Sequence, residues 1–123
     1  MIRGIGIDII EVDRIRRATV RWGDVFLSRV FTPRERGYAG ASRSAAERLA
    51  GRFAAKEAVM KALGLGLRRM AWREIEIEGD PLGRPVVRLS GGAAEAAARL
   101  GVQAWFVSIS HTRDLAVAHA VAE

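Results

Sequence analysis

The feature that most constrains the fold is an uninterrupted helical pattern from residue 45 to about residue 63. Ser44 and Glu47 form a capping-box pattern at its start, and Gly64 is placed to terminate it. One side carries large apolar residues, namely Leu49, Phe53, Met60 and Leu63, and another side carries Ala50, Ala54, Ala58 and Ala62. A helix that is apolar over so much of its circumference is expected to be buried on several sides. Its alanine face would let a neighbouring backbone come close.

The other segments carry patterns of strands and shorter helices. Strand-like alternation occupies residues 4–9, 73–78, 86–90, 104–110 and 115–121. Helical patterns occupy residues 11–21, 25–31 and 93–100, and a further helix begins at Thr32-Pro33 with Glu35 closing a capping box. A glycine-rich loop follows the long helix. The strands occur in hairpin-like pairs and the helices are grouped, which predicts an α+β fold with a largely antiparallel sheet packed against one long and several short helices.

Length and composition restrict the class of protein. The chain has 123 residues, which fits a single domain over residues 1–123. It contains no cysteine, so it has neither disulfides nor a thiolate metal site. We find no signal-peptide pattern and no apolar run of the roughly 18 residues that a membrane span needs. The cytoplasm is therefore the default location, with no membrane partner.

The net charge of +6 indicates acidic partners, among them nucleic acid, nucleotide phosphates or an acidic protein. Most of the positive charge is arginine, and a biased genomic base composition explains this equally well. A nucleic-acid-binding module is one alternative, but the chain lacks a recognisable binding motif and an aromatic platform interleaved with basic residues.

Glu57 is the first candidate for chemistry. A carboxylate on a mostly apolar helix is costly to bury unless something pairs with it. Lys61 lies one turn further on, so an ordinary helix salt bridge is one interpretation. The other is a site for a metal ion and phosphates, favoured because Arg52, Lys56 and Lys61 place several positive charges around one acid.

Asp8 is the second candidate. It follows Gly4 and Gly6 in the first strand and points away from the isoleucine face. Glycines in a strand let another element or a ligand approach the backbone closely. Asp8 could cap the next helix, and Glu11 could belong to the same cap. Alternatively, Asp8 and Glu57 share a magnesium ion, which needs few protein ligands and keeps waters and substrate phosphates.

The third candidate is the segment 108–112, which leaves a strand and enters a turn. Its hydroxyls, the His111 imidazole and the turn amides can all bind phosphate, although a histidine in a turn is often structural. His119, in the last strand, is expected to be a packing residue.

Together these segments resemble the holo-[acyl-carrier-protein] synthases, the small bacterial 4'-phosphopantetheinyl transferases. The resemblance rests on GIGIDIIE at residues 4–11, RFAAKEAVMKALG at residues 52–64, VSISHT at residues 107–112 and GRP at residues 83–85. It spans the whole chain, and the second motif is highly specific. Residues 20–24 and 37–43 match the family pattern poorly.

The resemblance implies a Mg²⁺-dependent transfer of 4'-phosphopantetheine from coenzyme A to a serine of apo-acyl carrier protein, in support of fatty acid biosynthesis. Adenosine 3',5'-bisphosphate is the other product. The implied catalytic residues are Asp8, Glu57 and Lys61, and Asp8 and Glu57 are the implied metal ligands. The implied coenzyme A contacts are Arg52, Phe53, Lys61, Gly64, Pro85, His111 and Thr112. The serine proton needs an acceptor, for which Glu57, Asp8 or a metal-bound water could serve.

The resemblance also implies partners. Arg14, Arg17 and Arg21 share one helix face, which would be either a solvated basic face or a docking face for the acidic carrier protein. A homotrimer is implied, with active sites at subunit interfaces. We expect His111 and the Asp8–Glu57 pair of one site to come from different chains. The second alternative is a non-catalytic adaptor that binds carrier proteins or nucleotides without turnover.

Overall fold

The computed structural model describes residues 1–65 and 70–123, so most of the predicted glycine-rich loop lies outside the described residues. The helices are α1 (Val12–Trp22), α2 (Asp24–Val30), α3 (Pro33–Ala39), α4 (Ala45–Leu63) and α5 (Gly91–Leu100), with a short 3-10 turn η1 (Trp72–Glu74). The strands are β1 (Gly4–Glu11), β2 (Ile75–Gly79), β3 (Pro85–Leu89), β4 (Trp105–His111) and β5 (Leu115–Ala122). Within the described residues, no helix combines the length and the apolar character needed to span a membrane.

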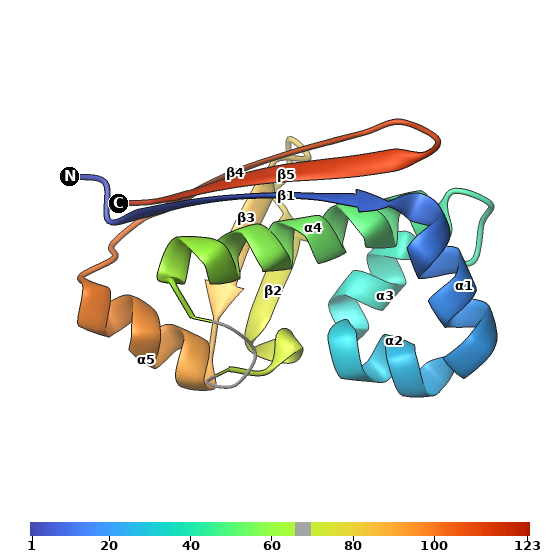
Figure 1. The fold of residues 1–123 in the computed structure, drawn as a ribbon, viewed down its shortest axis with the longest axis horizontal. Helices are drawn as coiled ribbons and strands as arrows, with labels where there is room; N and C mark the ends of the chain where they lie inside the picture. Colours follow the sequence, from blue (N-terminus) through green and yellow to red (C-terminus); the bar gives the residue numbers. More distant parts are fainter. Residues whose placement is uncertain (66–69) are drawn as a thin grey trace.

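Antiparallel pairing organises both groups of strands. One sheet has the order β1–β5–β4, and β2 and β3 form a separate hairpin. The long helix α4 runs beneath the three-stranded sheet, and the β2–β3 hairpin crosses behind it (Figure 1). The helices α1, α2 and α3 gather near one end of α4, and α5 lies near the other. The predicted α+β class is confirmed.

The sheet and α4 meet at unusually short range. A Cβ atom placed on Gly4 would lie 2.0 Å from the Ala62 carbonyl oxygen, and one on Gly6 would lie 1.9 Å from that of Ala58. The close approach predicted from these glycines is therefore the contact of β1 with α4. The face of β5 toward the helix carries only alanines, all buried, namely Ala116, Ala118, Ala120 and Ala122. Small side chains on both surfaces allow this packing, and α4 is largely buried, as predicted.

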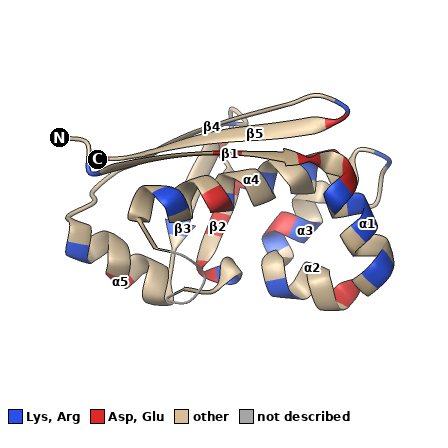
Figure 2. Ribbon diagram, viewed as in Figure 1, with Lys and Arg blue, Asp and Glu red and all other residues tan. Residues whose placement is uncertain are grey.

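The opposite face of the sheet is exposed and mostly apolar, and its polar residues include Ser108, Ser110 and His119. Ile5, Ile7 and Ile9 are 60–63% exposed, and Phe106 on β4 is 56% exposed. No described helix covers this face (Figure 1), and few charged residues lie on the strands that form it (Figure 2). His119 lies in the middle strand of this face, opposite Ile7, and is exposed in the single chain, so it is not the packing residue that we predicted.

The two predicted capping boxes have different outcomes. Thr32 and Glu35 form a complete capping box at the start of α3. Ser44 precedes α4, but its side chain makes no capping hydrogen bond and instead lies 3.0 Å from the Ser42 hydroxyl. The strand predicted from residue 73 begins later, at Ile75, because residues 72–74 form the η1 turn.

Candidate active site

Asp8, Glu57 and Lys61 lie together where β1 crosses α4. Glu57 and Lys61 are one turn apart on the helix, and Asp8 projects from the strand face that packs against it. The Lys61 ammonium group donates a hydrogen bond to the Ile7 carbonyl oxygen at 2.9 Å and lies 3.4 Å from Asp8 Oδ1. The close contact of Gly6 with Ala58 brings Asp8 to this position, because both residues lie on the same strand face.

This geometry removes two simpler interpretations. The helix after β1 begins at Val12, with Glu11 at the N-cap position and no side-chain capping bond, so Asp8 is not a helix cap. Lys61 pairs across to Asp8 rather than along the helix. Among residues 1–65 and 70–123, the Glu57 carboxylate has neither an ion pair nor a hydrogen bond, so the i,i+4 salt bridge of the first interpretation is not formed.

The ionised form of Glu57 is disfavoured in the protein without a bound cation. Burial raises the pKa of Glu57, the Asp8 carboxylate raises it further, and Lys61 and Arg14 act in the opposite direction. Two carboxylates side by side repel each other, and a divalent cation between them would relieve this repulsion. No cluster of three or more His, Cys, Asp or Glu side chains suited to a metal occurs within the described residues. Mg²⁺ needs only one or two carboxylates when waters and phosphates complete its shell, so this donor set fits it.

Lys56 does not belong to this cluster, contrary to the prediction that it adds positive charge around Glu57. Its ammonium group lies on another side of α4, fully buried, 2.7 Å from Glu35 Oε1. It also donates to the carbonyl oxygens of Trp72 and Ile75, at 3.1 Å and 2.6 Å. The helical period explains the error, because adjacent residues on a helix point about 100° apart.

Arg52 also faces away from Glu57, into an open pocket of about 540 Å³ that Tyr38 and Gly83 help to line. Its side chain is only 7% exposed, and its guanidinium lies 4.1 Å from the centroid of the Tyr38 ring. Arg52 Nε is buried without a hydrogen-bond partner among the described residues. A buried guanidinium with an unused donor is suited to an anion. The sequence did not single out Tyr38.

Pro85 lies beside this pocket, at the start of β3. It lines a neighbouring cavity of about 530 Å³ between the 80–86 turn and strand β4. Gly83 lines both cavities, so the predicted glycine-basic-proline turn borders the Arg52 region. Gly64 ends α4 as predicted, one turn after Lys61.

His111 and Thr112 lie at the end of β4, far from Glu57 of the same chain. His111 Nδ1 is 3.6 Å from the Glu47 carboxylate on the first turn of α4. Glu47 and Glu57 are ten residues apart on that helix, which corresponds to about 15 Å along its axis. The Thr112 hydroxyl accepts backbone hydrogen bonds from Asp114 and Leu115, so it shapes the β4–β5 turn. A single chain therefore does not bring His111 to the Asp8–Glu57 pair.

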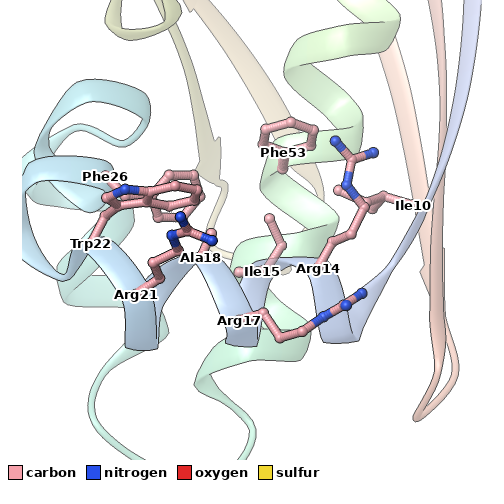
Figure 3. Close-up of a pocket in the computed structure, with 9 residues that line it drawn as sticks. All are labelled: Ile10, Arg14, Ile15, Arg17, Ala18, Arg21, Trp22, Phe26 and Phe53. Carbon is pink, nitrogen blue, oxygen red and sulfur yellow. The ribbon is translucent and has the colours of Figure 1, made fainter.

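The three arginines of α1 border a groove of about 480 Å³ (Figure 3). Apolar residues complete its lining, namely Ile10, Ile15, Ala18, Trp22, Phe26 and Phe53. Arg14 lies at the end near Ile10 and Phe53, whereas Arg21 lies over the Trp22 ring, 4.9 Å from its centroid. Arg17 pairs with Asp13 at 3.0 Å. The sequence indicated the basic face but not the apolar groove, because the groove forms only when α1, α2 and α4 pack together.

The fold and these clusters define an α+β protein with an acidic site suited to magnesium and separate basic sites suited to phosphates. The chain belongs to the 4'-phosphopantetheinyl transferase superfamily, whose family model matches residues 4–120. The resemblance inferred from the sequence motifs is thereby confirmed.

Several relatives within this family are similar over their whole length. The holo-[acyl-carrier-protein] synthase of Desulforudis audaxviator is 52% identical over 122 residues, which cover 99% of this chain and 93% of that protein. The crystal structure of the Neisseria meningitidis holo-[acyl-carrier-protein] synthase has a TM-score of 0.90 and 36% identity, covering 100% of this chain and 99% of that one. The Helicobacter pylori enzyme, solved in complex with coenzyme A, has a TM-score of 0.85 and 32% identity, covering 97% of this chain and 99% of that one.

Proposed function

We propose that this protein transfers the 4'-phosphopantetheine group of coenzyme A to a serine hydroxyl of apo-acyl carrier protein, releasing adenosine 3',5'-bisphosphate. The observation that carries the proposal is the Asp8–Glu57–Lys61 cluster, formed by two of the family's motifs. The relatives named holo-[acyl-carrier-protein] synthase support the reaction, and the Helicobacter pylori complex supports coenzyme A as the donor. We place the reaction in fatty acid biosynthesis in the cytoplasm.

Asp8 and Glu57 would hold the magnesium ion. A bound Mg²⁺ supplies Lewis-acid catalysis and neutralises charge on the pyrophosphate of coenzyme A. The position of the two acids supports this assignment, because a divalent cation between them would relieve their mutual repulsion. Lys61 pairs with Asp8, and its side chain stays half exposed, so its ammonium group would contact the same pyrophosphate.

Arg52, Pro85, His111 and Thr112 would form the nucleotide half of the site. Arg52 has a buried and unused donor, and Pro85 borders the neighbouring cavity. Phe53 and Gly64 would contact coenzyme A from the same helix as Glu57. We propose that Arg52 binds a phosphate of the nucleotide portion, because a buried guanidinium pairs strongly with such a group.

We propose that the protein is a homotrimer and that each site combines the Asp8–Glu57 pair of one chain with His111 of another. The separation of about 15 Å along α4 within one chain supports a shared site. The exposed isoleucine face of the β1–β5–β4 sheet supports a subunit interface, because a contiguous apolar patch of this kind marks an interaction surface.

The basic face of α1 would dock the carrier protein. Arg14, Arg17 and Arg21 border a groove with an apolar lining, and acidic carrier proteins would be attracted to the arginines. Because exposed charges are screened by salt, the rate of encounter should fall as ionic strength rises.

One experiment tests the reaction itself. Apo-carrier protein is incubated with coenzyme A, Mg²⁺ and this protein, and the intact carrier is weighed by mass spectrometry. The proposal predicts a gain of one phosphopantetheine group on one serine. Binding of the carrier without any gain in mass would instead identify a non-catalytic adaptor.

A further inference from the structure

Helices α3 and α4 lie antiparallel and are joined by three contacts, which we call the α3–α4 ladder. Its contacts are Arg48 Nη1 to the Ala39 carbonyl oxygen at 3.1 Å, the Arg52 guanidinium over the Tyr38 ring at 4.1 Å, and Lys56 Nζ to Glu35 Oε1 at 2.7 Å. The three basic residues are spaced four apart, so they share one face of α4. Arg52, which we assign to coenzyme A, is the middle contact of this ladder.

The Glu35–Lys56 contact is a fully buried ion pair whose groups are all hydrogen bonded. Lys56 also donates to the Ile75 carbonyl oxygen at 2.6 Å, and Glu35 Oε2 accepts from the Ile77 amide at 2.8 Å. The pair thus fastens α3 and α4 to each other and to β2, which leads into the turn that borders the Arg52 pocket. Buried ion pairs often contribute little net stability to the folded state. We therefore consider that this pair serves to fix the position of α3 relative to α4.

Arg52 is held mainly by its neighbour on α3. Its Nε makes no hydrogen bond within the described residues, and its guanidinium lies against the Tyr38 ring. Tyr38 is one turn after Glu35, so its position follows from where the Glu35–Lys56 pair fixes α3. Burial lowers the pKa of Arg52, whereas its interaction with the Tyr38 side chain and the negative charge of Glu35 act in the opposite direction.

We propose that Glu35 and Lys56 are positioning residues for the coenzyme A site: they fix α3 against α4 so that Tyr38 holds the Arg52 guanidinium in the orientation that binds the nucleotide phosphate. The inference rests on the proposed function, because it takes Arg52 as a coenzyme A contact. Both side chains are fully buried, so neither is accessible to a bound substrate. Their effect should therefore reach the reaction only through Arg52.

The test compares steady-state kinetics of the wild type, the double variant E35Q/K56M, R52A and the triple variant. Replacing both partners avoids leaving one buried charge unpaired. The double variant should raise KM for coenzyme A about tenfold, corresponding to about 1.4 kcal/mol, with KM for the carrier and kcat nearly unchanged. In the R52A background the double replacement should add no further rise in KM, because residues that act through one group are not additive.

Two controls keep the result interpretable. D24N/R36Q removes an exposed ion pair between α2 and α3, observed at 2.7 Å, and should leave both KM values unchanged. If a thermal melt shows that the double variant does not fold, Tyr38→Leu is the second variant. Tyr38 is half exposed, so its replacement removes the contact of its ring with Arg52 without disturbing the core. It should raise KM for coenzyme A and leave KM for the carrier nearly unchanged.

Three outcomes would overturn the inference. The first is an unchanged KM for coenzyme A in the folded double variant or in Tyr38→Leu. The second is an equal rise of KM for coenzyme A and KM for the carrier. The third is that the double replacement raises KM for coenzyme A by the same factor in the wild type and in R52A. Absence of transfer by the wild type would count against the proposed function instead, so the two failures are distinguishable.

Discussion

Gly6 and Ala58 are in such close contact that a Cβ atom on Gly6 would lie 1.9 Å from the Ala58 carbonyl oxygen. This contact sets the distance between β1 and α4. Asp8 is two residues further along the strand, and Glu57 is adjacent to Ala58 on the helix. The backbone contact therefore determines how close the two acids come.

Gly6→Ala should lower the free energy of unfolding by about 3 kcal/mol, because the added methyl group meets backbone rather than a movable side chain. Urea denaturation measures the change. Gly79→Ala is a matched control, since Gly79 also lies in a strand but has no atom within 4 Å of an added Cβ. Equal effects of the two substitutions would contradict the packing explanation.

Glu57→Gln should abolish phosphopantetheine transfer while the protein stays folded. The amide removes one negative charge from the proposed magnesium site and changes little in shape. Transfer is measured by the mass of the carrier, and folding by circular dichroism and a thermal melt. Removing Mg²⁺ with a chelator should stop the wild-type reaction, and added Mg²⁺ should restore it. Full activity of the variant would refute the metal assignment.

Arg21→Glu should raise KM for the carrier at least about tenfold with little effect on KM for coenzyme A, because it reverses charge on the proposed docking face. Arg14→Glu should also raise KM for the carrier far more than KM for coenzyme A. Arg14→Glu is harder to interpret than Arg21→Glu, because Arg14 lowers the pKa of Glu57 and its replacement would also affect the proposed metal site. Arg99→Glu on α5 is a control of equal charge change at an exposed site. Equal effects on both substrates would count against docking by α1.

Ile7→Glu should convert the protein from trimer to monomer and abolish activity, since a charge would be buried in the proposed interface. Light scattering coupled to gel filtration measures the mass. Val20→Glu serves as the control, because Val20 is an 88% exposed residue on α1, outside the sheet face. A trimeric Ile7→Glu variant would exclude this face as the interface.

Local patterns were sufficient to predict the elements. Gly64 predicted the end of α4, Thr32 the start of α3, and the alanine pattern the burial of the long helix. Ser44 shows the limit of such signals. Its capping pattern is the same as that of Thr32, yet the Ser44 hydroxyl is hydrogen bonded to the Ser42 hydroxyl. The Glu47 carboxylate lies 3.6 Å from His111 Nδ1 and does not close a capping box.

Contacts between elements could not be derived from spacing. Lys56 is adjacent to Glu57 in sequence but buried on another side of the helix, against Glu35. The role of Tyr38 depends on how α3 lies along α4, and no local pattern encodes that. The alternation of glycine and isoleucine in β1 does not by itself show which side of the strand faces the core. Gly4 and Gly6 decide it, since only a side without Cβ atoms lets β1 approach α4 this closely.

The central claim is that one active site combines Asp8 and Glu57 of one chain with His111 of another, and subunit mixing tests it most directly. Glu57→Gln and His111→Ala proteins, each inactive alone, are unfolded together, refolded, and confirmed as mixed trimers by native mass spectrometry. Random mixing of equal amounts should restore about a quarter of the wild-type sites, because only one pairing of neighbours in four supplies both intact residues. Mixed trimers that show no transfer would contradict the claim.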